Sequence, residues 1–262
     1  MRRSFTLAAA GLAVLALPTA ASADSHTAQS FSATIGQAND SGASADAELL
    51  LDGNDLTVRI DGSGFFDGFP HAMHLHGEPG GDNVCGPLNP GDEGFEAADA
   101  DGDGFLSVVE GVPAYGPVTV SLTTEGDTSG DSGLAVDRFT TSGTLDYERT
   151  FEVSDEVADN LSSLHIVVHG ADLTGSGEIG DLENEDGTMK MSSLDPELPF
   201  EATAPAACGQ IVTTGTAAGP DTGAGGTAPA SSSGNGALLA GALGLGALGT
   251  LAGSRRRSNQ AA

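Results

Sequence analysis

Positive charge is scarce in this sequence, because 9 lysines and arginines stand against 37 aspartates and glutamates and the formal net charge is −28. Five of the nine are arginines near the chain ends, at positions 2, 3 and 255–257. Without those five charges the net charge of −28 becomes −33. Nucleic acids and anionic membrane surfaces would be repelled, which excludes both as partners. The charge suits solubility in salt or attraction of cations, although most of these acids would simply form a solvated surface.

Long hydrophobic runs are also lacking. The longest, at 237–252, falls short of the roughly 20 residues that a typical membrane helix needs. The chain opens with Arg2 and Arg3, an apolar stretch at 7–17 and the small residues Ala21-Ser22-Ala23. This order predicts a cleavable signal peptide at 1–23, and the paired arginines leave a twin-arginine route open as an alternative to the general one. The sequence therefore predicts a secreted protein.

The C-terminal part has the composition of a tether. Residues 213–236 are rich in Gly, Ala, Thr and Ser, which predicts a flexible, disordered stalk. The hydrophobic segment and basic tail at 237–262 follow it, and Pro220-Asp221-Thr222-Gly223 resembles part of a sortase signal, with Gly219 where that signal has Leu. We expect retention at the cell surface, in the wall or the membrane. The alternative is a disordered tail with a fortuitous apolar end.

Cysteine is rare, with only Cys85 and Cys208. Because an exported chain enters an oxidising compartment, we expect one disulfide between them. Closing so long a loop would stabilise the fold by roughly 4 to 5 kcal/mol.

Between the two ends lies one domain, at 27–212, whose periodicity is that of β-strands. Apolar residues alternate with polar ones on both sides of Asp52-Gly53-Asn54-Asp55, a hairpin signal. Further strands are expected at 118–122, 144–153 and 164–169, and one short helix follows a Ser154 cap. The fold class is therefore all-β, a closed sandwich or barrel with long loops.

Histidines gather in two places. On an extended chain His74 and His76 share a face about 6 to 7 Å apart, so both imidazoles can reach one metal ion. Surface histidines without a metal are the alternative. His165 and His169 also share a face, but about 13 Å apart, so one of them would be a ligand and the other structural.

The histidine pattern resembles the copper-zinc superoxide dismutase family. The matching segments are His71-x-x-His74-x-His76, Val167-Val168-His169 and Ala207-Cys208-Gly209-Gln210-Ile211. The resemblance implies a Greek-key β-barrel or sandwich of superoxide dismutase type, with copper held by His74, His76 and His169. It further implies a supporting role for His71, and a role for Asp172 in orienting a copper ligand.

Three departures from the family narrow this reading. Leu88 stands where the family has a histidine that bridges copper and zinc, and the chain has no histidine between His76 and His165, so no zinc is expected. Pro205 stands where an arginine guides superoxide to copper. A zinc-free copper site remains that would act on superoxide, giving oxygen and hydrogen peroxide, or on another small molecule.

A second resemblance competes with the first. Chordin-type repeat domains, known as CHRD domains, are similar in their alternating first strands, in a His-x-His-Gly motif, and in a later segment like Gly116-Pro117-Val118-Thr119-Val120-Ser121-Leu122. This alternative implies a non-enzymatic extracellular binding or structural module stabilised by calcium.

An acidic loop has the spacing of a calcium site. Residues 99–110 fit the pattern D-x-D-x-D-G-x5-E, with the side chains of Asp99, Asp101, Asp103 and Glu110 and the carbonyl of Phe105 as ligands. The alternative is a solvated acidic turn. Because helix signals beside it are weak, we expect an isolated loop that pins a long insertion. A fainter copy begins at Asp172, with Thr174, Ser176, Gly177 and Glu183 in matching positions.

Overall fold

The computed structural model of the chain describes residues 27–216. The expected signal peptide at 1–23, the hydrophobic segment at 237–262 and most of the expected stalk lie outside the described residues. The first residues of that stalk belong to strand β9 (Val212–Thr216), which pairs with β1 (Gln29–Gln37). Ordered β structure therefore extends past the expected domain end at residue 212.

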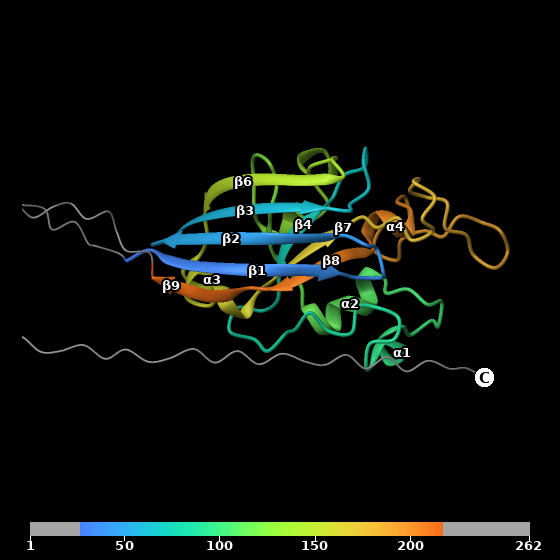
Figure 1. The fold of residues 1–262 in the computed structure, drawn as a ribbon, viewed down its shortest axis with the longest axis horizontal. Helices are drawn as coiled ribbons and strands as arrows, with labels where there is room; N and C mark the ends of the chain where they lie inside the picture. The colour runs from blue at the N-terminus through green and yellow to red at the C-terminus, as the bar shows by residue number, and fades with distance from the viewer. Residues whose placement is uncertain (1–26, 217–262) are drawn as a thin grey trace, which may run out of the picture. The chain divides into compact units, whose positions relative to one another are not determined.

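The described residues form an all-β fold, as predicted. One antiparallel sheet has the strand order β5-β4-β7-β8-β1-β2-β3-β6, and β9 adds to β1 beside β8 (Figure 1). The other strands are β2 (Ser44–Asp52), β3 (Asp55–Ser63), β4 (Met73–His76), β5 (Val118–Ser121), β6 (Thr144–Glu152), β7 (His165–His169) and β8 (Pro205–Gln210).

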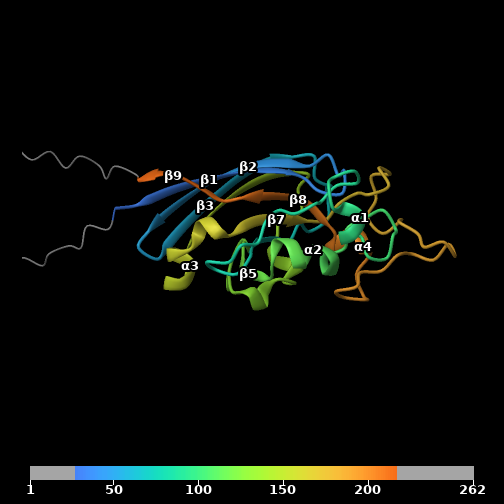
Figure 2. The same cartoon turned by 90° about the horizontal axis from the view of Figure 1, so that it is seen from below.

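The sheet curls into a half-barrel. Figure 2 shows β1, β2 and β3 on one side and β5, β7 and helix α3 (Asp155–Asp159) on the other. No strand pairing joins the edges β5 and β6 in the described part of the chain. Instead, the Arg149 guanidinium and the Tyr147 hydroxyl on β6 donate hydrogen bonds to the carbonyl of Thr123, at 2.7 and 3.2 Å. Side chains thus span the gap that strands leave.

The expected hairpin is confirmed. Asp52 pairs with Asp55 across the turn, where Gly53 has a φ of 62°, in the left-handed region that glycine tolerates best. Burial alternates strictly along β2, so every second side chain faces the inside of the curl. Leu49, Val58, Ile60 and Leu75 belong to this main core.

The outer face of the sheet is covered at β4, β7 and β8. Strands β4 and β7 are buried throughout, so both of their faces are shielded from water. A second, smaller core lies over Val167 and Cys208, formed by Leu88, Phe95 and other residues of the long 77–117 connection. This connection contains α1 (Phe95–Ala98) and α2 (Val108–Tyr115).

The remaining helical segments are short. Helix α3 begins at the predicted Ser154 cap, whose hydroxyl accepts a hydrogen bond from the Val157 amide. Helix α4 (Phe200–Thr203) precedes β8, and 3-10 turns lie at Gly130–Ser132, Val136–Arg138 and Leu161–Ser163. Within 27–216, no helix has the length and apolarity to span a bilayer.

Candidate metal centre

The period-two geometry of β4 and β7 places the histidines on the covered outer face of the sheet. Met73 and Leu75 point into the main core, so His74 and His76 point the other way. His74 pairs with Val167 on β7, and His169 lies two residues further along the same face, where its amide donates to the Ala72 carbonyl. Diagonal neighbours of this kind lie within reach of long side chains.

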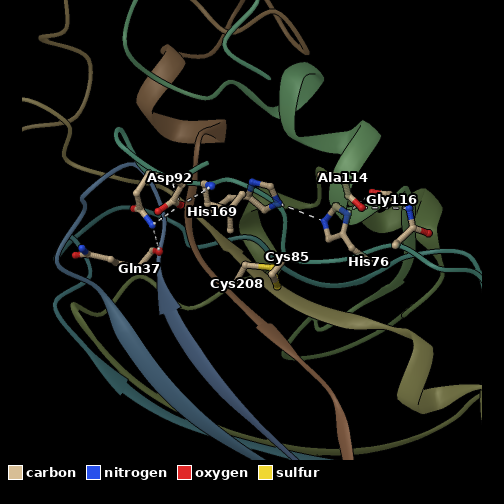
Figure 3. The surroundings of a disulfide bond; sticks show 11 residues. Gln37, His76, Cys85, Asp92, Ala114, Gly116, His169 and Cys208 are labelled. Atoms are coloured by element: carbon tan, nitrogen blue, oxygen red, sulfur yellow. Dashed lines mark hydrogen bonds between the residues drawn. A yellow bond between two sulfur atoms is a disulfide. The ribbon is translucent and has the colours of Figure 1, made fainter. Parts of the chain in front are cut away.

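Three of the histidines form a compact cluster. His74, His76 and His169 each contribute one ring nitrogen to a group whose members all lie within 4.8 Å of one another. His76 Nε2 lies 3.3 Å from His74 Nδ1 and 3.4 Å from His169 Nε2. Figure 3 shows the rings of His76 and His169 facing each other. The structure thus brings together the three residues that the sequence singled out as one ligand set.

The other ring nitrogen of each histidine faces a backbone carbonyl. His74 Nε2 lies 3.0 Å from the Gly133 oxygen, His76 Nδ1 2.9 Å from Gly116, and His169 Nδ1 2.7 Å from Thr203. A carbonyl can only accept, so each of these nitrogens must carry the hydrogen. In neutral imidazoles the converging nitrogens then carry lone pairs and no hydrogen. Three lone pairs directed at one point form a donor set that could hold a metal ion.

The three carbonyls come from the ends of short helical turns. Gly116 caps α2, Gly133 follows the Gly130–Ser132 turn, and Thr203 is the last residue of α4. Carbonyls at a helix C-terminus lack partners within the helix, which leaves them free to accept from an imidazole. Their partial negative charge also favours a cation nearby.

Burial keeps these imidazoles in the neutral form. The side chains are at most 4 % exposed, and the loss of hydration lowers the pKa of His74 well below its usual value. The same cause, together with the neighbouring His169, lowers the pKa of His76 to about 3, and burial lowers that of His169 to about 4. All three are therefore in the ligand form at neutral pH.

Of the other histidines near the cluster, His71 supports it through hydrogen bonds and His165 lies outside it. His71 lies 3.0 Å from the His169 carbonyl through Nδ1 and 2.6 Å from the Phe66 carbonyl through Nε2, so it fixes the end of β7. His165 is fully buried opposite His76, yet neither ring nitrogen has a hydrogen-bond partner in the described part of the molecule, and burial lowers its pKa. Of the two histidines on β7, His165 is therefore the structural residue, and His169 belongs to the cluster.

No hydrogen bond joins Asp172, which the family resemblance assigns to orienting a histidine, to a histidine among the described residues. Its carboxylate accepts hydrogen bonds from the amides of Gly175, Ser176 and Gly177, and the Thr203 carbonyl holds His169 instead. The carbonyls of Gly116, Gly133 and Thr203 carry no side-chain signal in the sequence. Only the folded chain reveals them.

The acidic loop at 99–110 is compact, and Asp99, Asp101 and Glu110 bring one oxygen each to within 4.8 Å of one another. Asp99 accepts from the amides of Gly102, Asp103 and Gly104. Burial raises the pKa of Glu110, but hydrogen bonds from Ser107 and from the Ala100 and Asp101 amides lower it by more. The donor set suits a hard cation.

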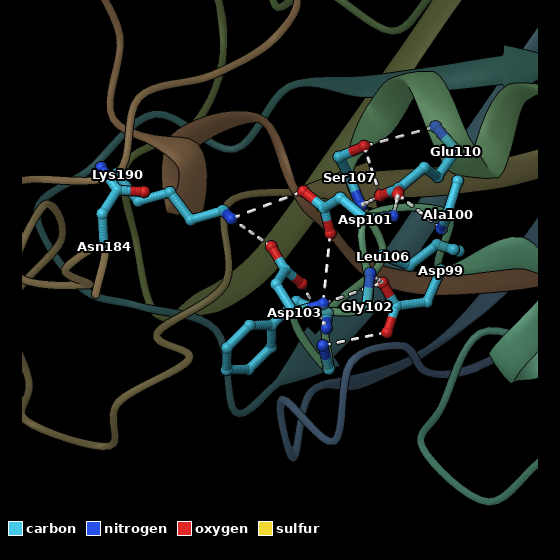
Figure 4. A network of polar contacts seen from close by, with 12 residues as sticks. Asp99, Ala100, Asp101, Gly102, Asp103, Leu106, Ser107, Glu110, Asn184 and Lys190 are labelled. Atoms are coloured by element: carbon cyan, nitrogen blue, oxygen red, sulfur yellow. Dashed lines mark hydrogen bonds and ion pairs between the residues drawn. The ribbon is translucent and has the colours of Figure 1, made fainter. Parts of the chain in front are cut away.

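Two features of this loop differ from the prediction. Asp103 points away from the group and forms an ion pair with Lys190, the sequence's single lysine, which also lies 3.7 Å from Asp101 (Figure 4). The Phe105 amide donates to Asp103 at 2.8 Å. Moreover, α1 ends directly before the loop and α2 begins within it, although the helix signals beside the loop are weak: Ser107 and Glu110 form a capping box at the start of α2.

The fainter copy at Asp172 repeats the backbone pattern of the first loop. Asp172 accepts from the amides three, four and five residues ahead, as Asp99 does, and Ser176 N donates to the Thr174 hydroxyl. Glu183 instead forms an isolated bridge with Met189 and does not join a group of metal-ligand spacing in the part of the chain described.

The expected disulfide is confirmed. Cys85 and Cys208 are bonded, with Cα atoms 5.8 Å apart, and tie the long connection between β4 and β5 to β8 (Figure 3). The Val84 amide beside it donates to the Ala114 carbonyl of α2, close to the Gly116 carbonyl that holds His76. The bond therefore steadies one wall of the centre.

Comparison with known proteins identifies no family for this chain: no family model matches it and no curated relative is found.

Proposed function

We propose that the chain is a copper-binding protein in which His74, His76 and His169 are the ligands. The observation that carries the proposal is the convergence of three ring nitrogens whose partner nitrogens are all occupied by carbonyls. That arrangement leaves three buried lone pairs without donors, and a metal ion would satisfy them together.

Copper fits the donor set best. Imidazole ligands suit copper, zinc, iron and nickel, and copper binds nitrogen ligands most strongly among the divalent ions of this series. The resemblance to copper-zinc superoxide dismutases supports this choice, and Leu88 in place of the bridging histidine argues against zinc beside it. Bound copper would supply one-electron oxidation and reduction, the chemistry that superoxide dismutation requires.

Metal analysis of the purified protein, combined with a superoxide assay, tests the proposal. We expect one copper per chain, lost in His74→Ala and kept in His165→Gln, which removes a buried histidine of the same sheet face outside the cluster. Dismutation above that of free copper, absent in His74→Ala, would support the enzyme. Copper binding without activity would leave a binding protein, and no stoichiometric copper would favour the non-enzymatic CHRD-like module.

We further propose a structural calcium ion at the loop 99–110. Asp99, Asp101 and Glu110 already lie together, and Asp103 would join them only by leaving Lys190. Because Glu110 also caps α2, whose C-terminal Gly116 carbonyl holds His76, calcium here would steady one side of the copper centre.

Thermal unfolding with and without calcium tests this second site. Calcium at about 100 times its dissociation constant would stabilise the protein by about 2.7 kcal/mol. We expect Asp99→Asn to abolish the calcium-dependent rise in melting temperature, and Asp137→Asn, an exposed acid outside the loop, to keep it. An equal rise in both variants would assign the effect to general charge screening.

Export and surface retention are part of the same proposal. The two-arginine start, apolar stretch and small-residue site support cleavage after Ala23, and the motif at 220–223 with its apolar and basic followers supports attachment. The N- and C-terminal masses of the mature protein test both. A mature chain that begins at Met1 would refute export by this signal.

A further inference from the structure

A cavity of about 360 Å³ opens directly over the histidine cluster, and His74, His76 and His169 are part of its lining. Its walls come from separate parts of the chain: Val112 on α2, Leu134 and Val136 on the segment after the Gly130–Ser132 turn, and Leu194 and Leu198 ahead of α4. The cavity therefore connects the candidate metal position with the outside.

The lining is almost entirely apolar. Apart from the histidines, Asp131 is the one ionisable side chain that lines the cavity among the residues described, and its charge is negative. An anion that passes between these walls would lose its hydration without gaining a positively charged side chain, which is costly, and would be attracted only by the proposed copper ion. The net charge of −28 adds long-range repulsion. The walls of the cavity are thus unsuited to charged groups and suited to uncharged ones.

The mouth of the cavity also carries apolar side chains that the fold leaves open to water. Leu134, Val136 and Leu194 are 45, 43 and 47 % exposed, and all three line the cavity. Exposed apolar groups gathered at a cavity indicate a binding site more often than a purely structural surface. The volume is more than twice that of an engineered apolar cavity of about 150 Å³ that holds benzene. A diatomic substrate would leave most of it empty.

We infer that this cavity binds an uncharged, largely apolar organic molecule about the size of a substituted single ring, with one donor atom directed at the metal. The direction of that donor atom rests on the proposed copper site. Binding of the apolar portion of the molecule is independent of the copper site, because it depends only on the walls of the cavity. The inference replaces superoxide with a larger neutral molecule as the ligand that the site selects.

Three related probes test the inference on the copper-loaded full chain at about pH 8, where imidazoles are uncharged. Imidazole offers the metal donor alone, 4-phenylimidazole adds an apolar ring, and 4-(imidazol-4-yl)benzoate adds a negative charge to that ring. We expect the visible absorption of copper to report binding of 4-phenylimidazole about tenfold or more tighter than imidazole, since the ring buries apolar surface. The benzoate should bind more weakly than 4-phenylimidazole. Equal affinities, or a preference for the anion, would overturn the inference.

A wall variant locates the effect. Leu134→Ser with Leu194→Ser should remove most of the advantage of the phenyl ring and leave imidazole binding unchanged, because both leucines lie at the mouth. Leu50→Ser is the matched control, since Leu50 is 40 % exposed on β2 and does not line the cavity. An unchanged advantage in the double variant would place the ring elsewhere and refute the inference.

Calorimetric titration of the chelator-treated protein with benzyl alcohol separates this inference from the copper proposal. Saturable binding that the Leu134→Ser, Leu194→Ser variant loses supports the cavity even if copper does not bind. Copper binding without any response to benzyl alcohol or to the phenyl ring supports the metal site and overturns the cavity as a ligand site.

Discussion

Removal of the Cys85–Cys208 disulfide should destabilise the protein and loosen the candidate metal centre together. The two cysteines are separated by 123 residues, and closing a loop of that length lowers the entropy of the unfolded chain by an amount worth about 5 kcal/mol. Domains of this size are stable by about 5–15 kcal/mol, so the loss is a large share of the total.

Urea unfolding of Cys85→Ala, Cys208→Ala measures this loss. With a slope of about 2 kcal/mol per M, the midpoint should fall by about 2–3 M relative to the parent chain. Reductant should lower the midpoint of the parent and leave the double variant unchanged. Copper affinity should also fall, because Val84 beside the disulfide anchors the end of α2 that holds His76. A midpoint shift below about 0.5 M would refute the loop-entropy reasoning.

Three further predictions concern the surroundings of the centre. In the chelator-treated protein, burial lowers the pKa of His76 to about 3 and that of His169 to about 4, so the unfolded chain binds more protons than the folded one below about pH 6.5. The free energy of unfolding should therefore fall between pH 6.5 and 4, by about 3 kcal/mol for His169 alone. An unchanged urea midpoint over that range would contradict this prediction. Glu201→Gln should destabilise the fold by about 1–3 kcal/mol, because the fully buried carboxylate accepts hydrogen bonds from the Leu173 and Gly180 amides. Urea midpoints measure the change, and an unchanged midpoint would show that the amide side chain serves equally well. Gly170→Ala should lower the free energy of unfolding by about 2 kcal/mol or more and weaken copper binding, because φ at this position is 91° and the new Cβ would lie 2.9 Å from His71 Nδ1. Wild-type stability and copper affinity in this variant would exclude the expected clash.

The strands and the pairing of His74 with His76 were predictable from the sequence because both depend on local alternation. Side chains two apart on a strand share a face and lie close together, which placed His74 with His76. His165 and His169 also share a face, but four residues of strand hold them too far apart to bind one ion. The choice of His169 rather than His165 came from the family resemblance, since spacing alone left both open. The disulfide followed from there being only two cysteines in a chain with an export signal.

The backbone carbonyls that accept hydrogen bonds from the imidazoles were not predictable, because their positions depend on how loops distant in the sequence pack against β4 and β7. The carbonyls of Gly133 and Thr203 lie 59 and 34 residues from the histidines that they hold. Asp172 had a chemically suitable side chain, but its own loop amides satisfy it first. The ion pair between Lys190 and Asp103 likewise joins two loops whose approach no local pattern records.

Electron paramagnetic resonance of the chelator-treated full chain, titrated with copper(II), tests the central claim most directly. We predict saturation at one copper per chain with hyperfine coupling to three nitrogens, and loss of one of those nitrogens in His169→Ala. A spectrum that His169→Ala leaves unchanged, or binding that never saturates at one ion, would contradict a centre built from His74, His76 and His169.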